Sequence, residues 1–224
     1  SAPSITETNG DQTVTFTVTS PNEVDGGFDV AISANNGTAG SNDFTLVTTT
    51  VHFSGTAGET QSVTVTIKGD TLVEANETFS VVLGAISNTS PVQTAGETST
   101  LSATGTINND DTNTLSISAP SITETNGDQT VTFTVTSPNA VEGGFDVAIS
   151  TNDGTAGSSD YALVTTTVHF SGTAGETQSV TVTIKGDTTI EPNETFSVVL
   201  GAISNTSPAQ IAAITSGDSA TGTI

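Results

Sequence analysis

The chain has 224 residues, with two Lys or Arg against 24 Asp or Glu, and a formal net charge of -22 at pH 7. This charge repels phosphate groups, so we expect no nucleic acid and no anionic membrane surface as a partner. The absence of cysteine excludes disulfides, thiolate metal sites and cysteine nucleophiles. No apolar run approaches the roughly 18 residues of a membrane-spanning helix, so this sequence predicts no membrane insertion.

The chain contains the same unit twice. Residues 1–107 match residues 118–224 without a gap at a constant offset of 117, as 124 minus 7 and 224 minus 107 both show. Because the period has the size of a domain, each copy should bury its own core. We therefore predict two domains, 1–111 and 112–224. The first copy lacks a counterpart of residues 114–117, so its first strand is expected to be incomplete. The second lacks a counterpart of residues 108–111, so its C-terminal acidic segment is expected to be truncated.

Short strands with one buried face follow one another along each copy. In residues 12–19, Val14, Phe16 and Val18 alternate with polar residues, which is the pattern of a half-buried strand. Similar patterns predict further strands at residues 28–34, 48–54, 62–68, 78–86 and 101–107, and at 115–123 where the second copy opens. About seven short strands per copy predict an all-β fold of two tandem antiparallel β-sandwiches.

A loop with three acids follows the fourth predicted strand. Asp70, Glu74 and Glu77 have the spacing of one helix face, but like charges on one face and the Pro192 of the second copy disfavour a helix. Three closely spaced carboxylates repel one another and favour a bound cation. Irregular loops that offer only oxygen ligands suit Ca²⁺. The second copy keeps the same spacing with Asp187, Glu191 and Glu194.

Several motifs in order resemble those of the Calx-beta domain. They are a Gly-Thr-Ala loop at 37–39, the Asp-aromatic pair at 43–44, the Gly-Glu-Thr turn at 58–60 and Asp-x-x-x-Glu-x-x-Glu-x-Phe at 70–79. The resemblance covers essentially the whole chain, twice. It implies a seven-stranded immunoglobulin-like sandwich that binds Ca²⁺ in loops at one end. The family is known from regulatory loops of sodium-calcium exchangers and from large bacterial surface proteins.

The resemblance also implies which residues hold metal. In the first copy they are Glu7, Asp43, Asp70, Glu74, Glu77, Asp110 and Asp111, and in the second copy Glu124, Asp160, Asp187, Glu191 and Glu194. Two positions depart from the family pattern, because Asn109 replaces an acid and Gly69 stands where binding members often have Asp. We therefore expect one or two ions in the first copy and weaker binding in the second. The alternative is that these acids are solvated loop positions without an ion.

The predicted function is that of a non-enzymatic, Ca²⁺-binding structural or adhesion module in a large repetitive bacterial protein, at the cell surface or secreted. Its expected partners are calcium ions, adjacent repeats of the same chain and a cell-surface protein or glycan. An ion near Asp110 and Asp111 would stiffen the short segment that joins the two domains. No base is placed to activate a nucleophile, so catalysis is not expected.

Two other function classes stay open. One is a Ca²⁺-sensing regulatory module of a transporter or a multidomain enzyme, although two nearly identical copies argue against it. The other is a carbohydrate- or protein-binding module beside a secreted enzyme. That role would need an exposed aromatic patch, and the chain has only nine Phe and one Tyr.

Overall fold

The computed structural model describes residues 3–89 and 101–224, which form two compact units. Unit 1 takes its residues from the chain up to Asp70 and from Asn76–Asp110, whereas unit 2 comprises Thr71–Ala75 and Asp111–Ile224. The segment 71–75 lies in the first sequence copy but belongs structurally to unit 2. The domain boundary between residues 111 and 112 stays a prediction.

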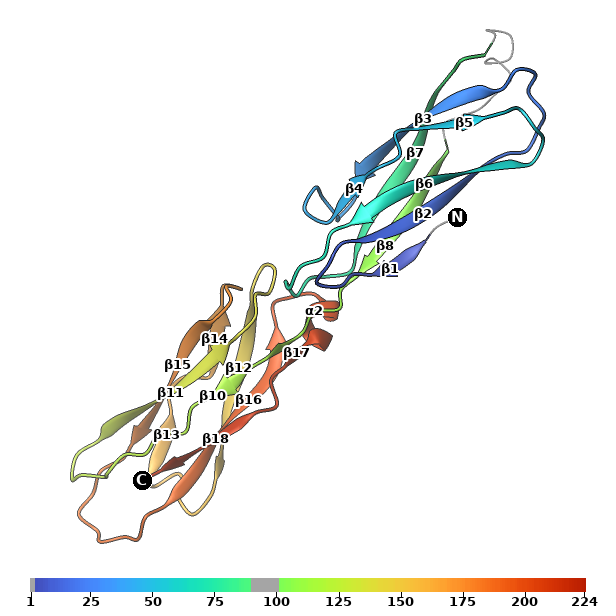
Figure 1. The fold of residues 1–224 in the computed structure, drawn as a ribbon. Coiled ribbons are helices and arrows are strands. Elements are labelled where there is room, and N and C mark those ends of the chain that lie inside the picture. Colours follow the sequence, from blue (N-terminus) through green and yellow to red (C-terminus); the bar gives the residue numbers. More distant parts are fainter. Residues whose placement is uncertain (1–2, 90–100) are drawn as a thin grey trace. The chain divides into compact units, whose positions relative to one another are not determined.

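Unit 1 is built from two sheets (Figure 1). The five-stranded sheet has the order β1 (Ser4–Thr6), β8 (Ser102–Asn108), β7 (Glu77–Ser87), β3 (Phe28–Asn36) and β5 (Thr50–Phe53). The three-stranded sheet has the order β2 (Gln12–Ser20), β6 (Glu59–Ile67) and β4 (Phe44–Leu46). The pairings are antiparallel except that β1 runs parallel to β8.

The core of unit 1 lies between these sheets. Along β6 the burial alternates, so that Val63 and Val65 are fully buried while Thr64 between them is only partly so. From the other sheet, β3 contributes Val30 and β5 contributes Phe53 to the same apolar cluster. Two facing sheets that bury one side each form a β-sandwich. The predicted all-β sandwich class is therefore confirmed.

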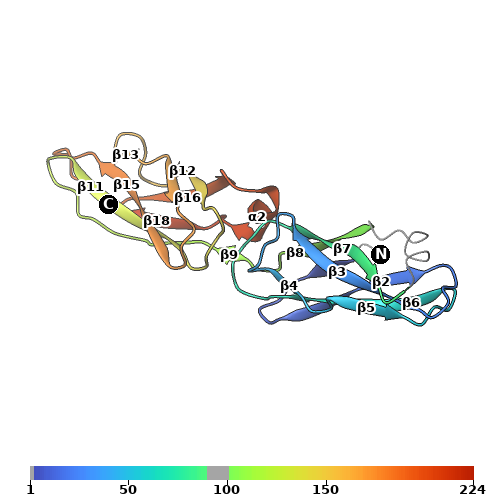
Figure 2. The ribbon, with the colours of Figure 1, turned by 90° about the horizontal axis from the view of Figure 1, so that it is seen from above.

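Unit 2 also has two main sheets (Figure 2), here of four strands each. It adds a third, shorter pairing. One sheet has the order β10 (Ser116–Ile117), β11 (Gln129–Ser137), β15 (Glu176–Ile184) and β13 (Tyr161–Leu163). The other has the order β14 (Thr167–Phe170), β12 (Phe145–Asp153), β16 (Thr195–Ser204) and β18 (Ser219–Thr223). In addition, β9 (Asn113–Thr114) runs parallel to β17 (Ile214–Thr215), beside the one described helix, α2 (Pro208–Ala213). Figures 1 and 2 place α2 at one end of unit 2 and the C-terminus at the opposite end.

The strand count differs from the expected seven. Within the described residues unit 1 has eight strands, because the expected first strand is present as the short β1 and the short β4 was not predicted. The strand expected at 115–123 is broken, since only β10 and an isolated bridge at Ser121 pair within it. Pro120 lies at this break, and its missing N–H prevents a continuous hydrogen-bond ladder.

The helix α2 was also not predicted. Ser207 is its N-cap and accepts a hydrogen bond from the backbone N–H of Gln210, whose side chain bonds back to the cap in a capping box. Pro208 occupies the first turn, where a missing N–H costs nothing. The motif Ser-Pro-x-Gln at residues 207–210 could therefore have predicted the start of this helix. Within residues 3–89 and 101–224, no helix has the length and apolarity that crossing a membrane requires.

Candidate metal centre

An aromatic stack in the core of unit 1 brings two predicted metal ligands together. Phe44 of β4 stacks on Phe79 of β7 with ring centroids 4.5 Å apart. Asp43 directly precedes one ring and Glu77 lies two residues before the other, so packing the rings places both carboxylates at the same end of the sandwich. Glu74 joins them, and the three offer ligand oxygens that all lie within 4.8 Å of one another.

The second copy builds the same arrangement. Tyr161 stacks on Phe196 with centroids 4.3 Å apart, which brings Asp160 and Glu194 together. With Glu191, these residues form a second group whose ligand oxygens lie within 4.8 Å of one another. The Asp-aromatic pair and the Glu-x-Phe motif are therefore two halves of one packing contact.

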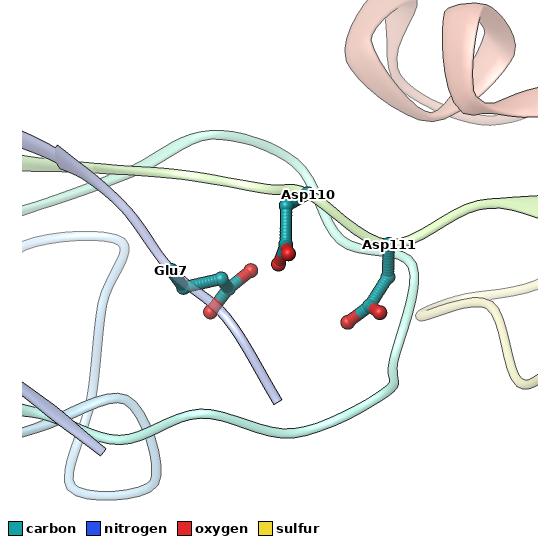
Figure 3. A group of neighbouring side chains, drawn as sticks. All are labelled: Glu7, Asp110 and Asp111. Atoms are coloured by element: carbon teal, nitrogen blue, oxygen red, sulfur yellow. The ribbon is translucent and has the colours of Figure 1, made fainter. Parts of the chain in front are cut away.

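A third group forms where β1 ends beside β8. The parallel register pairs Ile5 with Ile107, and the N–H of Glu7 donates to the carbonyl of Asn108 at 3.0 Å. Glu7 consequently lies next to Asp110 and Asp111, which follow β8. Figure 3 shows the three carboxylates directed toward one another, and their ligand oxygens lie within 4.8 Å.

Burial differs between the copies. Glu7 and Glu74 are buried, with 3% and 8% of their surface exposed, although charged carboxylates are rarely buried unless paired or ligating. In the second copy, Glu191, the counterpart of Glu74, is exposed and Glu194 is half-buried.

The acids of the second copy perturb one another electrostatically. Loss of hydration raises the pKa of Glu191, and the negative charges of Asp187 and Asp160 raise it further. Loss of hydration and the Asp160 charge likewise raise the pKa of Glu194. In contrast, the Gly157 N–H, which donates to the Asp160 carboxylate at 2.7 Å, lowers the pKa of Asp160. The group therefore holds one firmly ionised acid beside two that resist ionisation, a repulsion that a cation would relieve.

Two further predicted residues of the second copy line a pocket of about 550 Å³ together with Glu191 and Glu194. They are Glu124 and Asp187, and the N–H of Asp187 donates to the Glu124 carboxylate at 3.1 Å. Among the described residues, the three compact groups contain nine of the twelve predicted ligands, and Asp70, Glu124 and Asp187 lie outside them. The choice of ligands for each ion stays a prediction.

The residues present fit Ca²⁺. The donors are carboxylate oxygens, with no sulfur or imidazole among them. Ca²⁺ binds oxygen at about 2.3–2.6 Å, so two ligands on opposite sides of one ion lie about 5 Å apart. Oxygens that all lie within 4.8 Å of one another are therefore close enough to contact a single ion. Since Ca²⁺ takes about six to eight oxygens, three carboxylates leave positions for carbonyls and water.

Of the two sequence departures, Asn109 makes a backbone contact to the acidic loop and Gly69 has a steric reason. The Asn76 side-chain oxygen accepts a hydrogen bond from the Asn109 N–H at 3.2 Å, so Asn109 fixes the acidic loop through its backbone. Asn76 was not among the predicted site residues, although the Asn-Glu pair recurs in the second copy. A Cβ at Gly69 would come within 1.8 Å of the Thr8 carbonyl oxygen, so no Asp fits there.

The comparisons with known proteins agree with this geometry. The family model for the Calx-beta domain matches residues 1–111 and again residues 108–224. No curated protein shows significant sequence similarity to the chain.

Solved structures of low identity have similar folds. One is the calcium binding domain CBD12 of CALX1.1, with 17% identity over 100% of this chain and 97% of that chain, at a TM-score of 0.43. Another is the CBD2 domain of Calx, with 15% identity over 50% of this chain and 85% of that chain, at a TM-score of 0.39. Because these TM-scores are low, the assignment rests on the family model. The chain belongs to the Calx-beta domain family and consists of two such domains in tandem.

Proposed function

We propose that this chain binds Ca²⁺ in its acidic loops and serves as a non-enzymatic structural module. The observation that carries the proposal is the three groups of acids, each with ligand oxygens within 4.8 Å. Without a counter-ion, such groups destabilise the folded chain through repulsion between like charges.

The proposed mechanism is stabilisation and stiffening. Asp110 and Asp111 directly follow β8, and β9 begins at Asn113. An ion held by Glu7 and these two acids fixes the first residues of the joining segment to the end of β1. Too few residues then remain before β9 for the segment to move freely. In this proposal Ca²⁺ is part of the fold and not a transient signal.

Removing Ca²⁺ tests the proposal. Since an ion that binds only the folded state stabilises it, Ca²⁺ at 100 times its Kd contributes about 2.7 kcal/mol. We expect the melting temperature in millimolar Ca²⁺ to exceed that in chelator by on the order of 10 °C. Differential scanning calorimetry measures this shift, and Mg²⁺ should give a smaller one because it keeps its own water.

A matched variant separates specific binding from general charge screening. Glu23 is exposed and belongs to none of the acidic groups, so Glu23→Gln should leave the Ca²⁺ shift unchanged. Glu77→Gln removes the same charge from within a group and should reduce the shift. Equal melting curves in chelator and Ca²⁺, or equal shifts for both variants, would contradict Ca²⁺ binding at these loops.

The proposed location is the surface of a bacterial cell or its surroundings, within a large repetitive protein, and the proposed ligand class is a cell-surface protein or glycan. Support comes from the nearly identical duplication, the acidic surface and the absence of cysteine. Antibody labelling of intact, unpermeabilised source cells checks the location. Labelling that requires permeabilisation would rule the surface role out.

A further inference from the structure

One apolar position differs completely between the two copies. Val73 has 0% of its surface exposed, whereas its counterpart Ile190 is 100% exposed. Most exposed apolar residues of this size occur singly and need no explanation. Here, however, the matched pair Val47 and Val164 shows what a shared surface position looks like, with 57% and 59% exposed. The difference in exposure between Val73 and Ile190 therefore arises from the residues that contact each side chain.

Val73 belongs to the core cluster of unit 2. Its backbone pairs in a parallel bridge with Val141, which is itself 1% exposed. The Val73 N–H donates to the Ala140 carbonyl at 3.1 Å, and the Glu142 N–H donates to the Val73 carbonyl at 3.0 Å. Residues 71–75 thus pair with unit 2 as a short added strand and insert the Val73 side chain. Strand addition of this kind is a recognised mode of peptide binding.

The helix α2 completes the surface that binds residues 71–75. We call this surface, formed by residues 140–142 and Gln210, the receiving surface. Gln210 of α2 is 4% exposed, and its side-chain N–H₂ group donates to the Val73 carbonyl at 3.2 Å and to the Glu142 carbonyl at 2.8 Å. Its other amide atom accepts from the Thr206 hydroxyl at 2.7 Å. Without segment 71–75, one of these donated bonds would lose its acceptor, at a cost that buried polar groups rarely tolerate. The surface is therefore specific for a backbone carbonyl beside an apolar side chain.

The first copy has a loop at residues 23–25 that corresponds to residues 140–142 of the receiving surface. The Val24 N–H donates to the Gly55 carbonyl at 2.8 Å, as the Val141 N–H donates to the Gly172 carbonyl at 3.0 Å. Val24 is also buried, with 6% exposed. The counterpart of Gln210 in the first copy, residue 93, lies outside the described residues. Because both copies build this loop, it is a property of the repeat and not of unit 2 alone.

We propose that residues 188–192, with Ile190 as the inserted side chain, are a docking segment for a further copy of this repeat that follows in the same chain. That copy would pair its counterpart of Val141 with Ile190 and cover it with its counterpart of α2. The arrangement of the docking segment and the receiving surface within unit 2 would allow the same contact to recur from one copy to the next. Ile190 lines the pocket that includes Ile224, and Figures 1 and 2 place the C-terminus opposite α2. Each repeat therefore carries a docking segment at one end and a receiving surface at the other.

This inference does not depend on Ca²⁺, because the contacts of Val73 are apolar and backbone contacts. Fully burying a Val or Ile side chain contributes about 1.5–3 kcal/mol, which Ile190 gains only when a partner covers it.

A three-repeat chain provides the test. Joining residues 108–224 directly after Ile224 keeps the repeat register, because Ile224 corresponds to Ile107. The chain lacks cysteine, so one introduced thiol is a unique label. Ile190→Cys should react with a thiol reagent at the rate of a free thiol in the two-repeat chain. In the three-repeat chain we expect the reaction to slow by about tenfold or more, since it must then await local opening.

Matched variants control for accessibility. Val164→Cys should react at the same fast rate in both chains, whereas Val73→Cys should react slowly in both. Amide hydrogen exchange of the unsubstituted chains provides a second readout, with the Ile190 N–H protected only in the three-repeat chain. Equal labelling and equal exchange at residue 190 in the two chains would overturn the proposal. Protection in the two-repeat chain that disappears on dilution would also overturn it, because the partner would then be another molecule.

Discussion

The two acidic loops, 70–77 and 187–194, carry the same acids at the same spacing but have different environments. In the first loop Val73 and Glu74 are buried, whereas in the second loop Ile190 and Glu191 are exposed. Replacing Val73 and Glu74 by Ile190 and Glu191 changes neither the charge nor the apolar character. The difference therefore arises because segment 71–75 is covered within unit 2. A loop's ligands can thus be recognised from sequence, but their burial depends on what the loop packs against.

The largest expected effect comes from replacing the apolar residue that is buried in the first loop and exposed in the second. Val73→Asp should destabilise unit 2 by about 2–3 kcal/mol, because the segment would leave the core and lose the burial of one Val side chain and its hydrogen bonds. Ile190→Asp should change stability by less than about 0.5 kcal/mol, since that side chain is fully exposed. Tyr161 is the single Tyr of a chain without Trp, so its fluorescence during urea unfolding reports on unit 2. Equal effects of the two variants would contradict the packing of Val73.

A second prediction compares the metal ligands of the copies. Asp43→Asn and Asp160→Asn remove the same charge from corresponding groups. Each should weaken Ca²⁺ binding at its own group by at least the roughly 10–100-fold that loss of an outer-shell partner costs. Since Glu74 is buried and Glu191 exposed, we expect the tighter ion, and hence the larger loss of melting temperature in Ca²⁺, in the first copy. Isothermal titration calorimetry measures both affinities, and a tighter site in the second copy would reverse this expectation.

The smallest expected effect concerns pH in the absence of metal. The pKa values of Glu191 and Glu194 are raised above the usual 4.5 by loss of hydration and by neighbouring negative charges. The folded chain therefore binds protons that the unfolded chain releases, and the destabilisation present at pH 7 decreases as the pH falls toward 4.5. The lowered pKa values of Asp160 and Glu176 act in the opposite direction.

A comparison of variants isolates the contribution of Glu191 and Glu194. In chelator, the double variant Glu191→Gln and Glu194→Gln should melt above the native chain at pH 7, and the two should converge near pH 4.5. In Ca²⁺ the order should reverse, because the native carboxylates then bind the ion. Tyr161 fluorescence again follows unit 2. A difference that is independent of pH in chelator would contradict the raised pKa values.

Much of the fold was predictable because alternating burial is a local property of a strand. The strands at β2, β3 and β6 follow from the alternation of apolar and polar residues, and the Asp-aromatic and Glu-x-Phe motifs indicated the loops that carry the acids. Which strands pair with one another, in contrast, is not determined by the local sequence. The parallel β1, which sets Glu7 beside Asp110, depends on β8, whose strand begins nearly a hundred residues later. The short β4 next to Asp43 likewise forms only because β6 lies beside it.

The sequence by itself determined the tandem Calx-beta domains, the sandwich class and the positions of the acids, because the repeat and its motifs are visible in one dimension. Only the tertiary structure decided how those acids divide into groups, since the division depends on ring stacking and strand register between distant segments. It also decided that Val73 is buried while Ile190 is exposed. Burial is a property of neighbours in space, and two nearly identical loops acquire different physical roles when only one of them is covered.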